Sequence, residues 1–402
     1  MNEKLRRLLT PEGVRDLLPA LQESKRVVEA QLQDVFRSFG YREVSTPAFE
    51  YAASFITAPA DSLEEKMYRF PDERGRMMVL RPDFTVPLAR LAATHLAGEP
   101  RPLRLCYGGN IYRHTAGQST RRRELAQAGV ELIGGTCAGS DAEVVALAVT
   151  ALRELGVGQF TVCLGHVGFL QSLLETYGIN DFSGEQARNY LNSKDYVSLR
   201  EMISGLPLDA FARECLMKVP ALRGGREVLA EAAKLAPGKR GENALSALDE
   251  VCQILDDYGL AGFVTLDLGM VRDMDYYTGM VFEGFTAGMG FPLCGGGRYD
   301  NLLGFFGPEQ PAVGFALNID HLLVVLQRLK GLPAGRNLLF VGYGEAARVP
   351  AFTLAQDLRR QGTGVIVDVK ARDKAGAELE GKRLGAARTY YVPGNTNIES
   401  GG

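Results

Sequence analysis

Apolar residues at helical spacing mark the first regular element of the chain. They recur every three or four residues, which places them on one face of an α-helix. They are Val28, Leu32, Val35, Phe36 and Phe39. Gly40 follows directly and is placed to end this helix. Residues 41–46 then predict a short strand, which Pro47 stops.

Two longer strands are expected at residues 102–112 and 124–133, on either side of the polar loop 114–123. The second of them alternates, so its side chains fall on two different faces. One face is apolar and consists of Ala126, Ala128, Val130 and Leu132. The other face carries an amide and a carboxylate and consists of Leu125, Gln127, Gly129 and Glu131.

The side chains of Gln127 and Glu131 converge in either of two conformations. A strand puts them on one face, and a helix makes them neighbours because they are four residues apart. Gly129 and the adjacent glycines at 134 and 135 favour the strand. The shared face is then either a binding surface or the solvated outside of an antiparallel sheet. The pattern alone does not choose between these two interpretations.

Between residues 165 and 262 the apolar spacing becomes helical, which predicts a helical insertion at about 180–260. Strands are expected to resume after it, and a helix with one apolar face to follow the last strand. The strands are 264–268, 276–285 and 312–317, and the helix carries Ile319, Leu322, Leu323 and Leu326 on its apolar face.

A proline-containing stretch at 331–336 indicates a linker to a second domain. Residues 337–392 alternate apolar strand, helix and strand, which predicts a small α/β domain with about three strands. A glycine turn at 342–345 is expected to precede a helix at 346–361, and 395–402 to form a frayed tail. The predicted domains are 1–330 and 331–402.

Composition excludes several classes of protein. Hydrophobic residues are 46% and charged residues 23% of the 402, the balance of a globular protein. The formal net charge of −3 gives no global attraction to nucleic acid or anionic lipid. The six cysteines contain no C-x-x-C pair, so we expect reduced thiols and no metal site. The N-terminus lacks a signal-peptide core and no apolar stretch is long enough to span a bilayer, which predicts a soluble cytoplasmic protein.

Several motifs, taken in their order along the chain, resemble the class II aminoacyl-tRNA synthetase core and specifically histidyl-tRNA synthetase, over residues 10–325. Singly they are weak, because a glycine run is more often a turn and a double tyrosine more often core packing. The matching segments are 39–47, 80–85, the strand ending at Arg113 with its return strand, 272–279 and 295–300. The resemblance implies an α+β fold, with an antiparallel sheet core, flanking helices and the helical insertion, plus the small C-terminal α/β domain.

The same resemblance implies a pocket for the amino acid histidine. Asp83, Thr85 and Gln127 would take the α-ammonium group, since a cation needs carboxylate and neutral oxygen acceptors. The imidazole, which both donates and accepts hydrogen bonds, would be held by Glu131 and Tyr277. The remaining pocket residues would be Arg272 at the α-carboxylate, Tyr299 as a wall, and Arg113 and Tyr276. The family usually has glutamate where Asp83 stands, so we expect a longer or water-mediated ammonium contact.

The side of the pocket that would hold ATP departs from the synthetase pattern. Synthetases carry an Arg-x-Glu where this chain has Arg113-His114-Thr115, and a phenylalanine where it has Leu125. They also carry an arginine where it has His321. A histidine that is largely neutral at pH 7 cannot replace the permanently charged fork that holds phosphate. Compensation by the three arginines at 121–123 is the alternative, although a charge run in a polar loop is usually solvated.

This pocket, these losses and the shortened C-terminal domain together resemble the regulatory subunits of ATP phosphoribosyltransferase. The resemblance implies a non-catalytic subunit that binds and activates the short catalytic subunit in the first step of histidine biosynthesis. It further implies a homodimer core within a hetero-oligomer, histidine as feedback ligand, and no cofactor, metal, tRNA or membrane. Two other interpretations stay open: an active histidyl-tRNA synthetase that forms histidyl-adenylate, and a synthetase-like interaction module of another complex.

Overall fold

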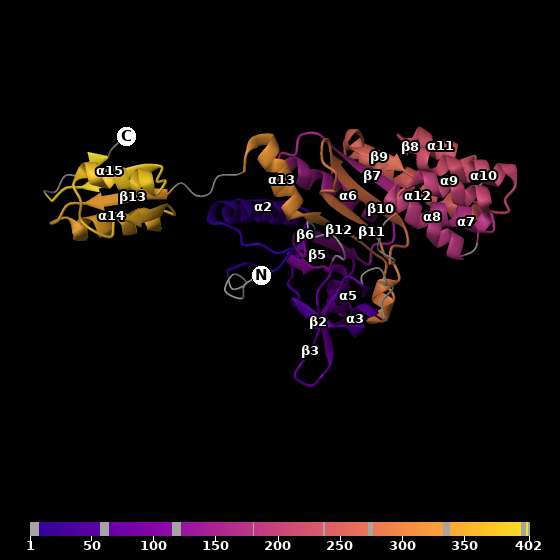
Figure 1. Cartoon of the computed structure of the whole chain (residues 1–402), viewed down its shortest axis with the longest axis horizontal. Helices are drawn as coiled ribbons and strands as arrows, with labels where there is room; N and C mark the ends of the chain where they lie inside the picture. The colour runs from indigo at the N-terminus through magenta and orange to yellow at the C-terminus, as the bar shows by residue number, and fades with distance from the viewer. Residues whose placement is uncertain are drawn as a thin grey trace. The chain divides into compact units, whose positions relative to one another are not determined.

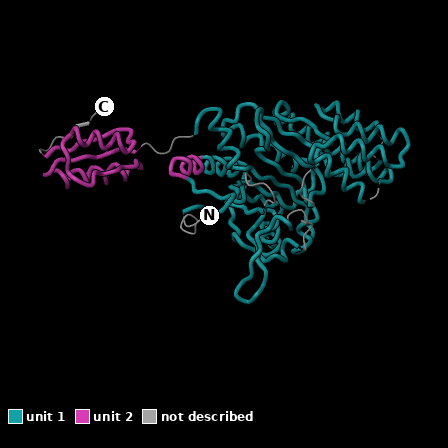
Figure 2. Tube along the Cα trace, in the orientation of Figure 1, with its two compact units in different colours: residues 1–17, 28–332 teal, residues 18–27, 333–402 magenta. Residues whose placement is uncertain are grey.

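The chain forms two groups of contacting residues, and each group has its own main sheet. The computed structural model describes residues 8–56, 64–114, 122–179, 181–235, 238–271, 276–332, 338–394 and 399–400. Contacts between residues divide the chain into two units (Figure 2). Unit 1 comprises Met1–Leu17 and Val28–Leu332, and unit 2 comprises Leu18–Val27 and Pro333–Gly402.

A nine-stranded mixed sheet is the framework of unit 1 (Figure 1). Neighbouring strands are antiparallel except for the pairs β1–β5 and β7–β9, which are parallel. In spatial order the strands are β1 (Arg42–Glu43), β5 (Leu103–Tyr112), β6 (Glu124–Ile133), β12 (Ala312–Asn318), β11 (Cys294–Arg298), β10 (Met280–Thr286), β7 (Phe160–His166), β9 (Val264–Asp267) and β8 (Arg223–Gly224). With its flanking helices, this sheet confirms the predicted α+β fold class.

The register of the central strands decides which side chains face the site. Glu131 on β6 lies opposite Gly314 on β12, and the alternation of a strand puts their neighbours Val130 and Phe315 on the other face. That other face is covered by the part of α2 (Pro19–Ser38) that belongs to unit 1, because the ring of Phe36 packs edge-to-face against Phe315 at 6.1 Å. The helix predicted around Phe36 is thus the one that closes the back of the sheet.

Two further helices bring polar groups to the sheet. α6 (Ala138–Glu154) lies on the same side as α2, where Asp141 forms a buried ion pair with Arg298 of β11 at 2.7 Å. α13 (Ile319–Lys330) follows β12 and is capped by Asn318, whose side chain accepts a hydrogen bond from the backbone of His321. On the opposite face, α5 (Thr85–Thr94) packs against β6.

A small antiparallel sheet carries the chain into α5. Its order is β2 (Phe49–Tyr51), β4 (Met77–Leu80) and β3 (Tyr68–Pro71), and α3 (Ala53–Ile56) follows β2. Residues 81–84 connect β4 to α5. Arg81 anchors this connection, since its guanidinium donates to the carbonyl oxygens of Thr46 and Asn110 at 2.7 and 2.8 Å.

The predicted helical insertion is a run of helices that packs beside β7 and β9 (Figure 1). Its longest helix buries the apolar stripe seen in the sequence, which includes Leu248 and Leu255. The elements are α7 (Val167–Thr176), α8 (Asp181–Ser193), α9 (Tyr196–Gly205), α10 (Ala210–Lys218), η1 (Val219–Ala221), α11 (Glu227–Ala233), α12 (Gly238–Asp257) and η2 (Ala261–Phe263). Of the helices that the structure describes anywhere in the chain, none is long and apolar enough to cross a membrane.

Unit 2 is an α/β arrangement with its own core. The sheet order is β14 (Gly364–Val367), β13 (Leu338–Tyr343), β15 (Arg388–Val392) and β16 (Glu399–Ser400), and the first three strands are parallel. The helices are α14 (Arg348–Arg360) and α15 (Lys374–Arg383). Val341, Ala351 and Val392 belong to the buried cluster between them.

Four predictions of local structure were wrong in detail. The strand expected at 41–46 is only Arg42–Glu43, because the Thr46 carbonyl is taken by the Arg81 side chain rather than by a strand. The strand expected at 276–285 begins at Met280. Gly342 and Tyr343 belong to β13 rather than to a turn. Glu399–Ser400, expected in a frayed tail, pairs with β15 and gives unit 2 a fourth strand.

Strand β11 was not predicted, and the glycine run at 295–297 lies within it. A Cβ at Gly296 would lie 2.1 Å from the carbonyl oxygen of Gly314. The two strands approach so closely that only glycine fits. The glycine run is therefore a feature of strand packing.

We predict that Asp141→Ala lowers the free energy of unfolding of unit 1 by about 3 kcal/mol, because it leaves the Arg298 guanidinium buried without its principal partner. Urea unfolding followed by circular dichroism measures this change. The control is Asp249→Ala, which breaks the exposed pair with Arg226 and should change stability by less than about 1 kcal/mol. Equal effects from both variants would contradict a structural role for the buried pair.

Candidate functional site

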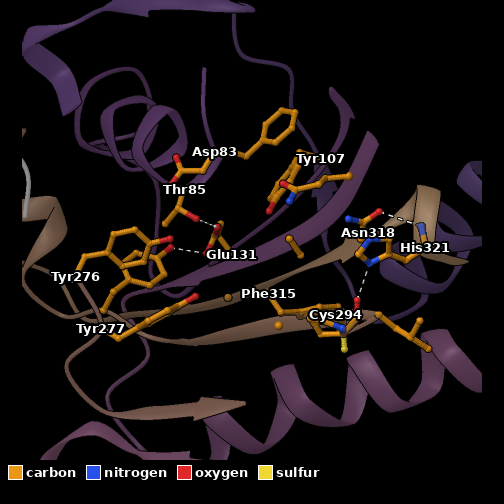
Figure 3. A pocket seen from close by; sticks show the side chains of 18 of the residues that line it. Asp83, Thr85, Tyr107, Glu131, Tyr276, Tyr277, Cys294, Phe315, Asn318 and His321 are labelled. Atoms are coloured by element: carbon orange, nitrogen blue, oxygen red, sulfur yellow. Dashed lines mark hydrogen bonds between the residues drawn. The ribbon is translucent and has the colours of Figure 1, made fainter. Parts of the chain in front are cut away.

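A cavity of about 150 Å³ opens between α5, the central strands and the segment that starts at Tyr276. It brings together eight of the nine residues that the sequence singles out for the pocket: Asp83, Thr85, Arg113, Gln127, Glu131, Tyr276, Tyr277 and Tyr299. The ninth, Arg272, lies outside the described residues. Asp83, Thr85, Glu131 and the two adjacent tyrosines gather toward one end, and Asn318 and His321 lie at the other (Figure 3).

The carboxyl group of Glu131 is almost completely buried, with 1% of the residue exposed. Thr85 Oγ1 donates to Glu131 Oε1 at 2.9 Å, and the Tyr299 hydroxyl donates to Oε2 at 2.5 Å. Burial raises the pKa of Glu131 to about 8, although both hydrogen bonds act to lower it. The interpretation of this strand face as a solvated surface is therefore wrong, and so is the helical alternative.

Glycines make the room that these groups occupy. A Cβ at Gly314 would lie 1.7 Å from Glu131 Oε2, and a Cβ at Gly129 would lie 2.4 Å from the hydroxyl of Tyr107. Both distances are well inside van der Waals contact. The facing strands β6 and β12 therefore admit Glu131 and Tyr107 only because they carry glycine at these two positions.

Asp83 is the second buried carboxyl, with 4% of the residue exposed. Its Oδ1 accepts a hydrogen bond from the backbone of Val86 at 3.3 Å. Its Oδ2 is buried and has no hydrogen bond of ordinary geometry within the described residues, although the Tyr276 hydroxyl lies close enough to this carboxyl group to lower its pKa. Burial raises the pKa of Asp83 to about 6, against the lowering effect of the Arg113 charge. A buried acceptor without a donor is costly, so this atom is suited to a ligand that brings a cationic donor.

A stack of side chains fixes the position of Asp83. Arg81 lies over the ring of Phe84 at 4.0 Å, and Phe84 stacks on Tyr107 with ring centroids 4.3 Å apart. Arg113 donates from Nε to the carbonyl of Pro82 at 2.7 Å. The residues on both sides of Asp83 are thus held by separate elements, which preorganises its carboxyl group in the cavity.

Three tyrosines form the wall next to Glu131. Tyr276 lies between the other two, with ring centroids 4.9 Å from Tyr277 and 5.7 Å from Tyr299. Burial raises the pKa of both Tyr276 and Tyr299 well above the ordinary value, so their hydroxyls stay protonated, and that of Tyr299 donates to Glu131. This wall offers neutral hydrogen-bond donors and apolar ring surface, which suits a small aromatic ligand.

The opposite end of the cavity is neutral. The Nδ1 atom of His321 lies 2.8 Å from the carbonyl oxygen of Pro292, which only accepts, so this nitrogen carries the hydrogen. Burial lowers the pKa of His321, which keeps the ring uncharged and leaves Nε2 as an acceptor. An acceptor in this place does not attract phosphate.

The two described arginines of the run at 121–123 are already engaged. Asp320, buried at the start of α13, accepts hydrogen bonds from Arg122, from Arg15 and from the backbone of Ala126. The side chain of Arg123 lies within 3.8 Å of a Glu12 carboxylate oxygen. Arg122 and Arg123 are therefore paired within the chain, and residue 121 lies outside the described residues. Of the other positions that depart from the synthetase pattern, Leu125 packs into the core and position 115 is not described.

Sequence reasoning missed several residues of the lining. Phe84, Tyr107, Cys294, Gly314 and Phe315 line the cavity without having been expected there. A signal existed for the strand residues, since Gly129 already stood on the face of Glu131 and a glycine on a strand face leaves room for a partner. The partner strand is not visible in the sequence, however, because β12 follows β6 by almost 180 residues.

Known proteins share this architecture. The sequence profile of the histidyl-tRNA synthetase family matches residues 13–322. A solved structure of an ATP phosphoribosyltransferase regulatory subunit/histidyl-tRNA synthetase from Bacillus halodurans superposes with a TM-score of 0.86 at 35% identity, over 96% of this chain and 98% of that one. Histidyl-tRNA synthetase from Nostoc shares the fold, with a TM-score of 0.83 at 19% identity over 96% of this chain and 91% of that one.

Similar sequences point to one family within this fold. The ATP phosphoribosyltransferase regulatory subunit of Moorella thermoacetica is 41% identical over 91% of this chain and 94% of its own length. That of Acetivibrio thermocellus is 37% identical over 98% of this chain and 94% of its own length.

The fold and the cavity define a protein of the histidyl-tRNA synthetase-like class. Within that class, the chain belongs to the family of ATP phosphoribosyltransferase regulatory subunits, as its near full-length relatives show. The resemblance drawn from the motifs is thereby confirmed at the level of the family.

We predict that Glu131→Gln makes the ligand-free protein more stable than wild type above pH 8, by an amount on the order of a few kcal/mol. The folded-state pKa of about 8 exceeds the ordinary value of 4.5. The contribution of protonated Glu131 is therefore fully present below pH 4.5 and is lost as the pH rises through 8. A glutamine at this position does not ionise, so the variant does not lose this stability at high pH. Thermal unfolding between pH 5 and 9 measures the difference, with the exposed Glu250→Gln as control. A pH-independent difference would contradict the prediction.

Proposed function

We propose that this chain is a non-catalytic subunit that binds histidine in the cavity and activates a short-form ATP phosphoribosyltransferase catalytic subunit. The observation that carries the proposal is the asymmetry of the cavity. Its acidic end has two buried carboxyl groups, Asp83 and Glu131, which suit an ammonium group and an imidazole. Its other end has a neutral His321 and an Arg122 that is already paired with Asp320.

The arrangement supports a specific mode of histidine binding. The α-ammonium group would donate to Asp83 Oδ2, which has no hydrogen bond of ordinary geometry from a described residue, and to Gln127, which lines the same cavity. The imidazole would lie along the tyrosine wall against Glu131. Each charge-assisted hydrogen bond contributes about 1.5–3 kcal/mol, so several of them select histidine over amino acids that leave Glu131 unmatched.

Thr85 has a second role besides the ammonium contact that the resemblance implies. Its hydroxyl hydrogen is committed to Glu131, so Thr85 orients that carboxyl. A hydroxyl oxygen also has two lone pairs, so Thr85 is still able to accept from the ammonium group. The Arg272 side chain would take the α-carboxylate, as the resemblance implies.

The same asymmetry argues against formation of histidyl-adenylate. Adenylation depends on positive charge held against the phosphates while charge develops in the transition state. At the end of the cavity where His321 lies, the chain has a hydrogen-bond-accepting imidazole nitrogen in place of a charged guanidinium group. Histidine would instead regulate the catalytic subunit through subunit contacts. A dimer of this chain, assembled with the catalytic subunit in the cytoplasm, would transmit whether the cavity holds histidine.

We predict that Glu131→Ala abolishes histidine binding while the fold is retained, because it removes the partner of the imidazole and leaves the Thr85 and Tyr299 hydroxyls unmatched. Isothermal calorimetry should show at least a hundredfold loss of affinity, as expected for about 3 kcal/mol. Circular dichroism checks the fold, and the exposed Glu250→Ala serves as control. Unchanged affinity would show that the pocket assignment is wrong.

Reconstitution with a purified short catalytic subunit tests the proposed role directly. We expect this chain to co-purify with the catalytic subunit and to raise its rate of phosphoribosyl transfer at least tenfold. The purified chain alone should show no histidine-dependent exchange of pyrophosphate into ATP. Exchange activity would establish the synthetase alternative, and failure to bind or activate the catalytic subunit would favour a role in another complex.

A further inference from the structure

Glu131 has no cationic partner among the described residues. Its two hydrogen bonds come from the neutral hydroxyls of Thr85 and Tyr299. A buried carboxylate without a countercharge is normally neutralised by a proton. Glu131 therefore holds a proton near neutral pH, in agreement with its raised pKa of about 8.

The other titratable groups of the lining do not supply the missing charge. They are Asp83, Tyr107, Arg113, Tyr276, Tyr277, Cys294, Tyr299 and His321. Asp83 adds a second negative charge and His321 is held neutral. Arg113 is the one cation of this set, and its charge acts on Asp83. Arg272, beyond the described residues, is assigned to the ligand carboxylate in the proposed mode of binding.

An imidazole is the ligand group that makes use of the proton on Glu131. A neutral imidazole has one nitrogen that accepts a hydrogen bond, and protonated Glu131 has one hydrogen to donate. The proton stays in the complex, either on the carboxyl group or on the ring. An ionised Glu131 could accept a hydrogen bond from the N–H of a neutral imidazole, but it would keep a buried negative charge without a countercharge. A protonated Glu131 beside an imidazolium would keep a buried positive charge in the same place.

We propose, on the basis of the proposed function above, that the cavity binds histidine together with one proton shared between Glu131 and the imidazole, which confines occupancy to a window near neutral pH. The alkaline limit is set by loss of the proton from Glu131. The acid limit is set by protonation of the free imidazole and of Asp83, which must be ionised to accept the ammonium group.

Histidine binding takes up a proton at alkaline pH and releases protons at acid pH. Above pH 8 the free protein has lost the Glu131 proton, so histidine binding takes up a proton and the affinity falls roughly tenfold per pH unit. Below the imidazole pKa of about 6.5, the free ligand and then Asp83 carry extra protons, so binding releases them. Net exchange therefore changes sign inside the window.

Calorimetry of histidine binding in buffers of different ionisation enthalpy tests the proposal. At pH 8.5 the wild type should take up roughly three quarters of a proton per histidine, and at pH 5.5 it should release protons. Glu131→Gln should lose the alkaline uptake and keep the acid release. Partial loss of the ligand's own ammonium proton adds the same small uptake to both proteins, so the difference between them isolates Glu131.

A second variant keeps the test decisive if Glu131→Gln binds too weakly. The Tyr299 hydrogen bond lowers the pKa of Glu131, so Tyr299→Phe should move the alkaline limit to higher pH. Tyr258→Phe, an exposed tyrosine in the insertion, should leave it unchanged. Equal uptake by wild type and Glu131→Gln, or affinity independent of pH from 6.5 to 9, would overturn the proton coupling and leave the pocket intact. Absence of histidine binding at every pH would overturn the proposed function itself.

Discussion

The burial of the Glu131 carboxyl group is the constraint on which the site depends. Two hydroxyls satisfy it, and they come from segments more than 200 residues apart in the chain, Thr85 at the start of α5 and Tyr299 directly after β11. The carboxyl group is accommodated because β12 carries Gly314 opposite it. Once these elements are joined around one buried group, the wall of tyrosines and the position of Asp83 follow from packing. The helices on the far side, α2 and α6, support the sheet without contributing to the lining.

Local patterns in the sequence predicted the elements whose sides differ in polarity. The helix around Val28 and the strand Glu124–Ile133 were placed closely, because each has one apolar face. Strand β11 was not recognised, since its glycines are required by the close approach of β12 and not by a local turn. The shortening of β1 and the fourth strand of unit 2 likewise depend on partners elsewhere in the chain.

The residues of the site were predicted by resemblance rather than by pattern. Periodicity placed Gln127 and Glu131 on one face but did not say whether that face was solvated or buried. The order of motifs supplied Asp83, Thr85 and the tyrosines, and the structure brings all the described ones to one cavity. What no sequence argument supplied was the electrostatic asymmetry of the cavity, because the pairing of Arg122 with Asp320 joins positions that are 198 residues apart.

That pairing has a consequence for substitutions at this end of the cavity. Arg15, Arg122 and the backbone of Ala126 all converge on Asp320, one residue before His321. Substitution of His321 by arginine alone would therefore add a cation to a neighbourhood where Arg15 and Arg122 are already paired, and would break the contact with the Pro292 carbonyl. The neutral character of this end of the cavity is thus tied to the packing at the start of α13, and a single substitution does not supply a phosphate site.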